Sequence, residues 1–191
     1  MSGVVIILAG IILLALSGLA GSLFAARPAA GQRVTTLVLA AGSALGLYGM
    51  AVAYGEPSLH TLRLPWPLPW GEFAIAADPA SILFLGPVFV VPALGSFYGW
   101  EYWKAAEHPR TTWRLCTAYG LLAGAMGLVV IARDGVLFLL AWELMALSAY
   151  FAATVEESDP EVRQAGWVYL IATHMGTLCL FALFALWNHA T

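Results

Sequence analysis

Glu143 is the residue whose type and surroundings point most directly to chemistry. It lies near the middle of the run Leu137-Phe-Leu-Leu-Ala-Trp-Glu-Leu-Met-Ala-Leu-Ser-Ala-Tyr150, which is apolar enough to span a bilayer. An ionisable group at that depth costs at least ~2.5 kcal/mol by insertion scales, so such groups face a protein interior or a wet cavity and mark ion or proton paths. A structural carboxylate, satisfied by a neighbouring helix, is the alternative interpretation.

His174 is the second ionisable residue in an apolar run, Leu170-Ile-Ala-Thr-His-Met-Gly-Thr-Leu178. In antiparallel spans, Glu143 lies ~12 Å from one face of a ~30 Å slab and His174 ~14 Å from the other face. The two side chains are therefore expected to share one polar layer. His174 is either a hydrogen-bonded packing residue or a proton relay, and Thr173 and Thr177 can satisfy a neutral imidazole or hold water.

Asp134 is a secondary candidate, in the turn Arg133-Asp134 that precedes the Glu143 run. Adjacent opposite charges at a membrane edge usually end helices, and a role for Asp134 at a proton exit is the alternative. The chain has one lysine, Lys104, in a predicted loop. Glu143 is therefore either protonated at rest or paired with a cation from another chain.

The composition shows which elements must position these residues. The chain has 191 residues, of which 61% are hydrophobic and 10% charged, and no soluble domain can hide that much apolar surface. We expect an all-α polytopic protein with a single membrane domain over residues 1–191 and six transmembrane helices. Each span is near the ~20 residues needed to cross the bilayer, at about 3–26, 34–54, 80–100, 112–132, 135–155 and 165–187.

The basic residues predict how these spans are oriented. One side of the membrane receives most of them, and Arg63 and Arg133 lie on the other; the larger set is Arg27, Arg33, Lys104, Arg110, Arg114 and Arg163. By the positive-inside rule the larger set is cytoplasmic, so the N-terminus and C-terminus both lie outside a bacterial-type plasma membrane. The first span has no preceding Lys or Arg and is too long for a signal peptide, so we expect a mature helix.

Other segments predict packing rather than chemistry. Leu64-Pro-Trp-Pro-Leu-Pro-Trp70 can form neither a helix nor a regular central strand, and its tryptophans are expected at the outer interface, as a cover over the helix ends. Small-residue pairs at four-residue spacing indicate close helix packing: Gly42/Gly46, Gly95/Gly99 and Gly120/Gly124. No disulfide, metal site, bound cofactor or nucleic-acid surface is expected, since Cys116 and Cys179 lie at different depths and no basic patch is present.

Two motifs resemble a known family. The segments from Asp134 to Tyr150 and from Tyr169 to Thr177 look like the antiporter-like membrane subunits shared by respiratory complex I, Mrp-type cation/proton antiporters and group 4 membrane-bound hydrogenases. The Thr-His-Met-Gly-Thr form most closely resembles the large antiporter-like subunit of formate hydrogenlyase-type hydrogenases. The resemblance extends over the whole chain and is most specific between residues 134 and 177.

The resemblance implies a proton-translocating subunit in which Glu143 pairs with a lysine on a broken seventh helix. Members of this family have about fourteen helices, including two inverted repeats. The chain resembles only their amino-terminal part, so it is expected to be a fragment, half of a split gene or a shortened subunit. Other membrane subunits, including one with the lysine-bearing helices, are the implied partners, besides the lipid bilayer.

Three functions follow as hypotheses. The first is a membrane subunit of a hydrogenase-like or complex I-like oxidoreductase that contributes Glu143 and His174 to a proton path and has no catalytic centre of its own. The second is a structural or assembly subunit in which Glu143 only docks a partner lysine. The third is a free-standing ion channel or carrier.

Overall fold

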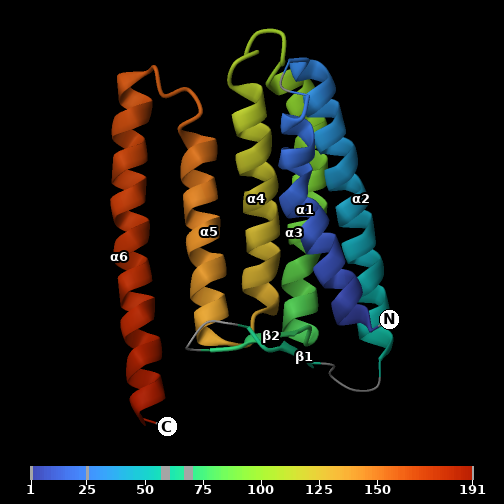
Figure 1. Ribbon diagram of the computed structural model, residues 1–191, viewed down its shortest axis with the longest axis vertical. Coiled ribbons are helices and arrows are strands. Elements are labelled where there is room, and N and C mark those ends of the chain that lie inside the picture. Colours follow the sequence, from blue (N-terminus) through green and yellow to red (C-terminus); the bar gives the residue numbers. More distant parts are fainter. Residues whose placement is uncertain (1, 25, 57–60, 67–70, 191) are drawn as a thin grey trace.

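The computed structural model describes residues 2–24, 26–56, 61–66 and 71–190, and it consists mainly of long helices (Figure 1). Within these described ranges, six helices are long and apolar enough to cross a membrane. Their bounds are α1 Gly3–Ser22, α2 Pro28–Gly55, α3 Pro79–Tyr102, α4 Thr112–Ile131, α5 Gly135–Ala153 and α6 Pro160–Ala190. The predicted all-α polytopic membrane fold is confirmed.

Prolines account for the largest differences between the predicted and observed helix starts. Helix α2 begins at Pro28 rather than near 34, and α6 begins at Pro160 rather than near 165. Proline suits the first turn of a helix because its fixed φ is already helical and its missing N–H has no partner there in any case. Both helices therefore extend beyond the apolar stretch into the loop at that end.

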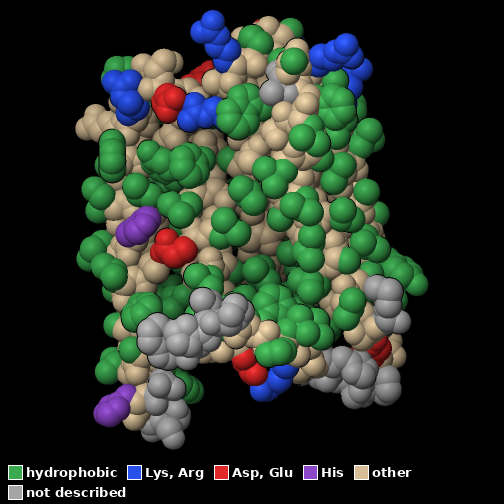
Figure 2. All heavy atoms as spheres, in the orientation of Figure 1, with side chains coloured by type: hydrophobic (Ala, Val, Ile, Leu, Met, Phe, Trp, Pro, Cys, Tyr) green, Lys and Arg blue, Asp and Glu red, His purple; other side chains and the backbone are tan. Residues whose placement is uncertain are grey.

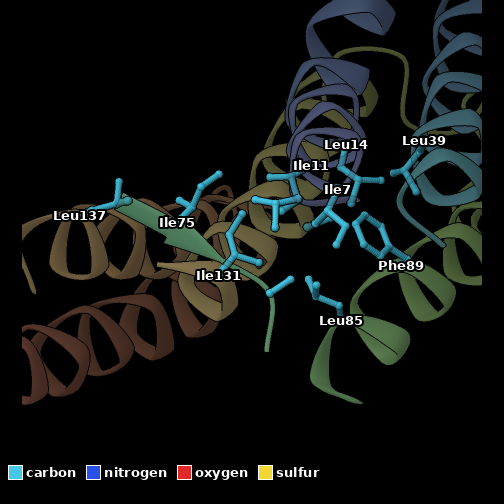
Figure 3. Close-up of a cluster of buried hydrophobic side chains, with 12 residues drawn as sticks. Ile7, Ile11, Leu14, Leu39, Ile75, Leu85, Phe89, Ile131 and Leu137 are labelled. Atoms are coloured by element: carbon cyan, nitrogen blue, oxygen red, sulfur yellow. The ribbon is translucent and has the colours of Figure 1, made fainter. Parts of the chain in front are cut away.

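Helix α1 is central to the packing, because it contacts both α2 and α4. A Cβ on Gly10 would lie 2.8 Å from the Cα of Gly46, and a Cβ on Gly18 would overlap the backbone of Cys116 and Thr117. Small residues thus let the backbones approach closely. Around these contacts, buried side chains from all three helices and from α3 form part of the apolar cluster in Figure 3: Ile7, Ile11, Leu14, Leu39, Leu85, Phe89 and Ile131.

A two-stranded antiparallel hairpin, β1 Thr61–Leu64 and β2 Phe73–Ala76, was not expected from the sequence. It lies across the ends of the helices, where Ile75 forms a bridge with Ala132 after α4 (Figure 1). The segment expected to cover the helix ends, residues 64–70, runs from the end of β1 toward β2 and is described only as far as Trp66, so that expectation stays a prediction. Trp66 packs against the buried cluster, whereas Trp70 lies outside the described residues. Four-residue strands are too short to give a readable alternation in sequence.

A polar network fixes the hairpin to the helix ends. The Asp78 carboxylate accepts a hydrogen bond from Ser81 N at 2.7 Å and lies 3.0 Å from Nη2 of Arg133. Nη2 also donates to Ser81 Oγ, and Arg133 N donates to the carbonyl of Ala74 in β2. The hydrogen bonds from Ser81, and then the Arg133 charge, hold the pKa of Asp78 below its ordinary value. Hairpin, α3 and the α4–α5 turn are thus joined.

This network predicts a pH-dependent contribution to stability. The pKa of Asp78 is lower in the folded chain than in the unfolded one, so the contribution is complete above the ordinary value of 3.8 and is lost as pH falls through the lowered native pKa. We expect Asp78→Asn to lower the Tm by about 2–4 °C at pH 7, for an exposed pair worth up to ~1 kcal/mol, and by less near pH 3. Thermal unfolding in detergent measures this difference, with Glu107→Gln as the control; an equal loss at both pH values would contradict it.

The charges are distributed unevenly between the two ends of the bundle. We call the end with β1 and β2 the hairpin end, and the opposite end, with residues 103–111 and 154–159, the loop end. Lysine and arginine gather mainly at the loop end in Figure 2, while both termini lie toward the hairpin end in Figure 1. The loop end is therefore the predicted cytoplasmic side.

Topology reporters test this orientation. We expect reporters after Arg27, near Lys104 and near Asp159 to lie in the cytoplasm, and one near Pro67 to lie outside, because the loop end carries most of the basic residues. Cysteine accessibility or a compartment-specific enzyme fusion measures each position. A cytoplasmic reporter near Pro67 would reverse the orientation.

Candidate functional site

Glu143 and His174 meet between α5 and α6. Nε2 of His174 lies 3.7 Å from Oε2 of Glu143. Figure 2 shows a histidine beside an acidic side chain within the largely apolar middle of the molecule. The expectation that the two residues share one level is confirmed, and their role in proton transfer stays a prediction.

The packing of α5 against α6 sets the distance between Glu143 and His174. Toward the hairpin end, Phe184 packs edge-on to Phe138 and lies against Gly135, where a Cβ would come within 3.3 Å of its ring. Toward the loop end, Gly166 lies so close to Thr154 that a Cβ would overlap the threonine methyl group. Contacts on both sides of the ionisable pair therefore hold the two helices side by side.

The imidazole is oriented by its own helix. Nδ1 of His174 lies 2.9 Å from the carbonyl oxygen of Leu170. A carbonyl only accepts hydrogen bonds, so we assign the proton of a neutral ring to Nδ1, which leaves Nε2 as an acceptor. The nitrogen that faces Glu143 is therefore the one that gains a proton when the ring becomes charged.

The geometry of the pair suits one proton shared between the two residues. A protonated carboxyl can face a neutral imidazole, or a carboxylate can face an imidazolium, and both states are attractive. The separation of 3.7 Å exceeds a hydrogen bond, so transfer requires a closer approach or one bridging water. Chemically, the site can accept a proton on one helix and pass it to the other.

The other predicted residues have local partners. Thr173 Oγ1 donates to the carbonyls of Tyr169 and Leu170, and Thr177 Oγ1 donates to the carbonyl of Thr173. Both hydroxyls bond back to their own helix, as helical Thr readily does, and their role beside the imidazole stays a prediction. Asp134 caps α5 by accepting from Val136 N and Leu137 N. Its predicted role at a proton exit is not needed to explain its position.

The ionisable pair also lies partly open on the surface of the described chain. The side chain of His174 is 48% exposed and that of Glu143 is 29% exposed. Within the part of the chain that the structure describes, the most apolar stretch of α6 has no buried residue. Ionisable side chains in membranes face protein or water rather than lipid, so this face requires a cover.

Sequence reasoning missed a second ionic cluster, at the loop end. Nδ1 of His108 lies 3.4 Å from Glu156 Oε1, and Arg114 makes a two-pronged contact with the Glu157 carboxylate at 2.8 and 3.3 Å. Hydrogen bonding and charge from Arg114 lower the pKa of Glu157. These links join the loop before α4 and the first turn of α4 to the α5–α6 loop. Among residues 2–24, 26–56, 61–66 and 71–190, no three metal-ligating side chains come together.

Comparisons with known proteins agree with a membrane subunit. No known family profile matches the chain. Uncharacterized proteins from two strains of Mycobacterium tuberculosis are 32% identical over 155 residues, which are 81% of this chain and 23% of each relative. NAD(P)H-quinone oxidoreductase subunit 2 of Synechococcus sp. is 30% identical over 131 residues, or 67% of this chain and 24% of that protein. The chain is similar to a complex I-type membrane subunit.

The matches cover most of this chain but only a small part of each relative. The chain spans about a quarter of the length of the curated relatives it matches. Together with the six apolar helices of the described residues, they support a multi-pass membrane protein. What those longer proteins do as a whole is carried over only as a proposal.

Proposed function

We propose that this chain is a membrane subunit of a complex I-like oxidoreductase and contributes Glu143 and His174 to a proton path. The observation that carries the proposal is the contact of Nε2 of His174 with Oε2 of Glu143, part-way through two apolar helices. A single protonatable pair at that depth is costly and is typical of proton relays.

The path continues beyond residues 1–191. Lys104 is the chain's one lysine, and it lies outside the helices beside Glu107. The partly exposed side of Glu143 and His174 is where further helices, from this gene or another, would bring the next proton-carrying group. A lysine on such a helix would complete the relay, as the family resemblance implies.

Two narrower assignments belong to the same proposal. The similarity to a quinone oxidoreductase subunit favours a quinone-type parent complex, and the Thr-His-Met-Gly-Thr motif keeps a hydrogenase-type parent as the second candidate. In both cases a bacterial-type plasma membrane is the proposed location, and the redox cofactors are held by partner subunits.

A structural role is the competing function, because a carboxylate on an exposed seam can also dock a partner cation. In that case Glu143 would be required for assembly but not for proton transfer. The two roles therefore differ in their dependence on a titratable group at position 143.

Purification from native membranes tests the proposal. We expect the tagged chain to bring with it further membrane subunits and redox-carrying subunits, and we expect the isolated chain in liposomes not to collapse a pH gradient. The physical reason is that one proton-holding pair does not bridge the remaining ~15 Å of hydrocarbon on either side. A chain that purifies only with itself and conducts protons faster than its Glu143→Gln variant would identify a free-standing channel instead.

A further inference from the structure

A groove of about 380 Å³ lies near the loop end, apart from Glu143 and His174. Helices α2 and α3 form one wall, the end of α5 and the start of α6 form the other, and α4 lies between them. Its surface is mostly apolar and includes Tyr98, Tyr102, Leu115, Tyr119 and Ala153. This volume falls within the ~300–1,000 Å³ range of small-molecule sites.

A glycine leaves the groove wider on one wall. Gly99 of α3 lines it, and a Cβ built there would meet nothing within 4 Å. Helix α3 packs against α2 and α4, whereas α5 packs against α4 and α6. The two walls thus stand apart across α4, and no described residue fills the space between them.

The polar groups along the groove are largely occupied by the protein itself. Gln32 Nε2 donates to the carbonyls of Gly99 and Trp103, both at 2.9 Å, and the Tyr119 hydroxyl donates to Pro92 O. A polar ligand would therefore gain few hydrogen bonds. Hydrocarbon gains dispersion contacts with the walls, and the lining hydroxyl of Thr35, which has no hydrogen-bond partner among the described residues, is already buried.

The mouth of the groove, unlike its apolar interior, carries a charged side chain. Glu156 is the charged side chain that lines it among the described residues, and its side chain is 51% exposed. Its Oε1 lies near His108, whose ring stacks on Trp103 with centroids 4.0 Å apart. Tryptophan and tyrosine at the end of a membrane helix mark the lipid headgroup level. The groove thus runs from that level into the bilayer.

We propose that the groove binds one acyl chain of a phospholipid whose headgroup carries a protonated amine, with the ammonium facing Glu156. The chain fills the apolar space over α4, and the carboxylate favours an amine over a headgroup with only negative charge. This inference does not depend on the proton path at Glu143.

Native mass spectrometry of the full-length chain in mild detergent tests the proposal, with equal amounts of phosphatidylethanolamine and phosphatidylglycerol supplied. We expect the parent to retain phosphatidylethanolamine about fivefold over phosphatidylglycerol, as one exposed ion pair allows. Glu156→Gln should keep lipid but lose the preference, while Glu161→Gln, outside the groove, should keep both.

Filling the groove tests the position of the acyl chain. Ala153→Phe on one wall and Gly99→Leu on the other should each reduce retained lipid about tenfold, since each occupies the apolar volume. Ala172→Phe, on the exposed surface of α6, is the matched control and should retain lipid like the parent. Circular dichroism confirms that each variant is folded. Because the two substitutions lie on different walls, the test does not depend on a single variant that fails to fold.

Three results would overturn the proposal. They are full lipid retention by both filled variants, equal retention of the two phospholipids by the parent, and an isoprenoid quinone as the molecule that the filled variants lose.

Discussion

Glu143→Gln in the assembled complex is expected to reduce proton translocation roughly 100-fold, the size of a typical general acid–base contribution, while assembly is largely kept. Glutamine keeps the size and one carbonyl acceptor of the side chain, but it cannot gain or release a proton at the position 3.7 Å from Nε2 of His174. Translocation is measured as substrate-driven proton uptake by proteoliposomes, and assembly by native gel electrophoresis.

The other substitutions at this position separate relay from docking. Glu143→Asp keeps the carboxylate but withdraws it by about one methylene, so coupled activity should fall only partly. Glu143→Ala removes the hydrogen-bonding group and strands any buried partner cation at a cost of roughly 3–5 kcal/mol, so assembly should also suffer. We expect activity to decline in the order Asp, Gln, Ala. If Gln pumps like the parent and only Ala disrupts the complex, Glu143 has a structural role.

Gly18→Leu is expected to prevent correct packing of the isolated chain. Any side chain on Gly18 overlaps the backbone of α4, and on Gly10 it comes within 2.9 Å of α2 backbone atoms. Backbone cannot move aside as a flexible side chain can, so the cost should exceed the ~1–3 kcal/mol of ordinary overpacking. Yield of monodisperse protein and its Tm in detergent measure the effect, and Gly10→Leu should behave similarly.

The control for the glycine substitutions is Gly176→Leu on α6. A Cβ there meets nothing within 4 Å, so leucine should be tolerated and should slightly favour the helix. Should Gly18→Leu fold as well as Gly176→Leu, close packing of α1 against α4 would not be required for stability.

The number of membrane helices and the depth of residues within them could be predicted from the sequence, because both follow from helix length and rise. Apolar length predicted six membrane helices, and the constant rise along antiparallel helices placed Glu143 and His174 at one depth. Of the glycine pairs, Gly42/Gly46 and Gly120/Gly124 do meet α1 closely, whereas Gly99 faces open space. Spacing alone does not tell which face of a helix meets a neighbour.

The sequence did not predict contacts that depend on long-range geometry. The hairpin pairs two four-residue strands, and Arg133 joins it to Asp78 across separate elements, which no periodic pattern records. The hydrogen bond from the imidazole to Leu170 was missed because the neighbouring threonines offered a simpler local partner. That bond is what turns Nε2 toward Glu143.

Infrared difference spectroscopy of the assembled complex, between the resting and the turning-over state, tests most directly whether Glu143 and His174 share one transferable proton. The account predicts a carboxyl C=O band that changes on turnover, is absent in Glu143→Gln and shifts in His174→Gln, because that variant removes the imidazole facing Oε2. A spectrum in which no carboxyl band depends on Glu143, or in which the Glu143 band is the same with and without the imidazole, would contradict it.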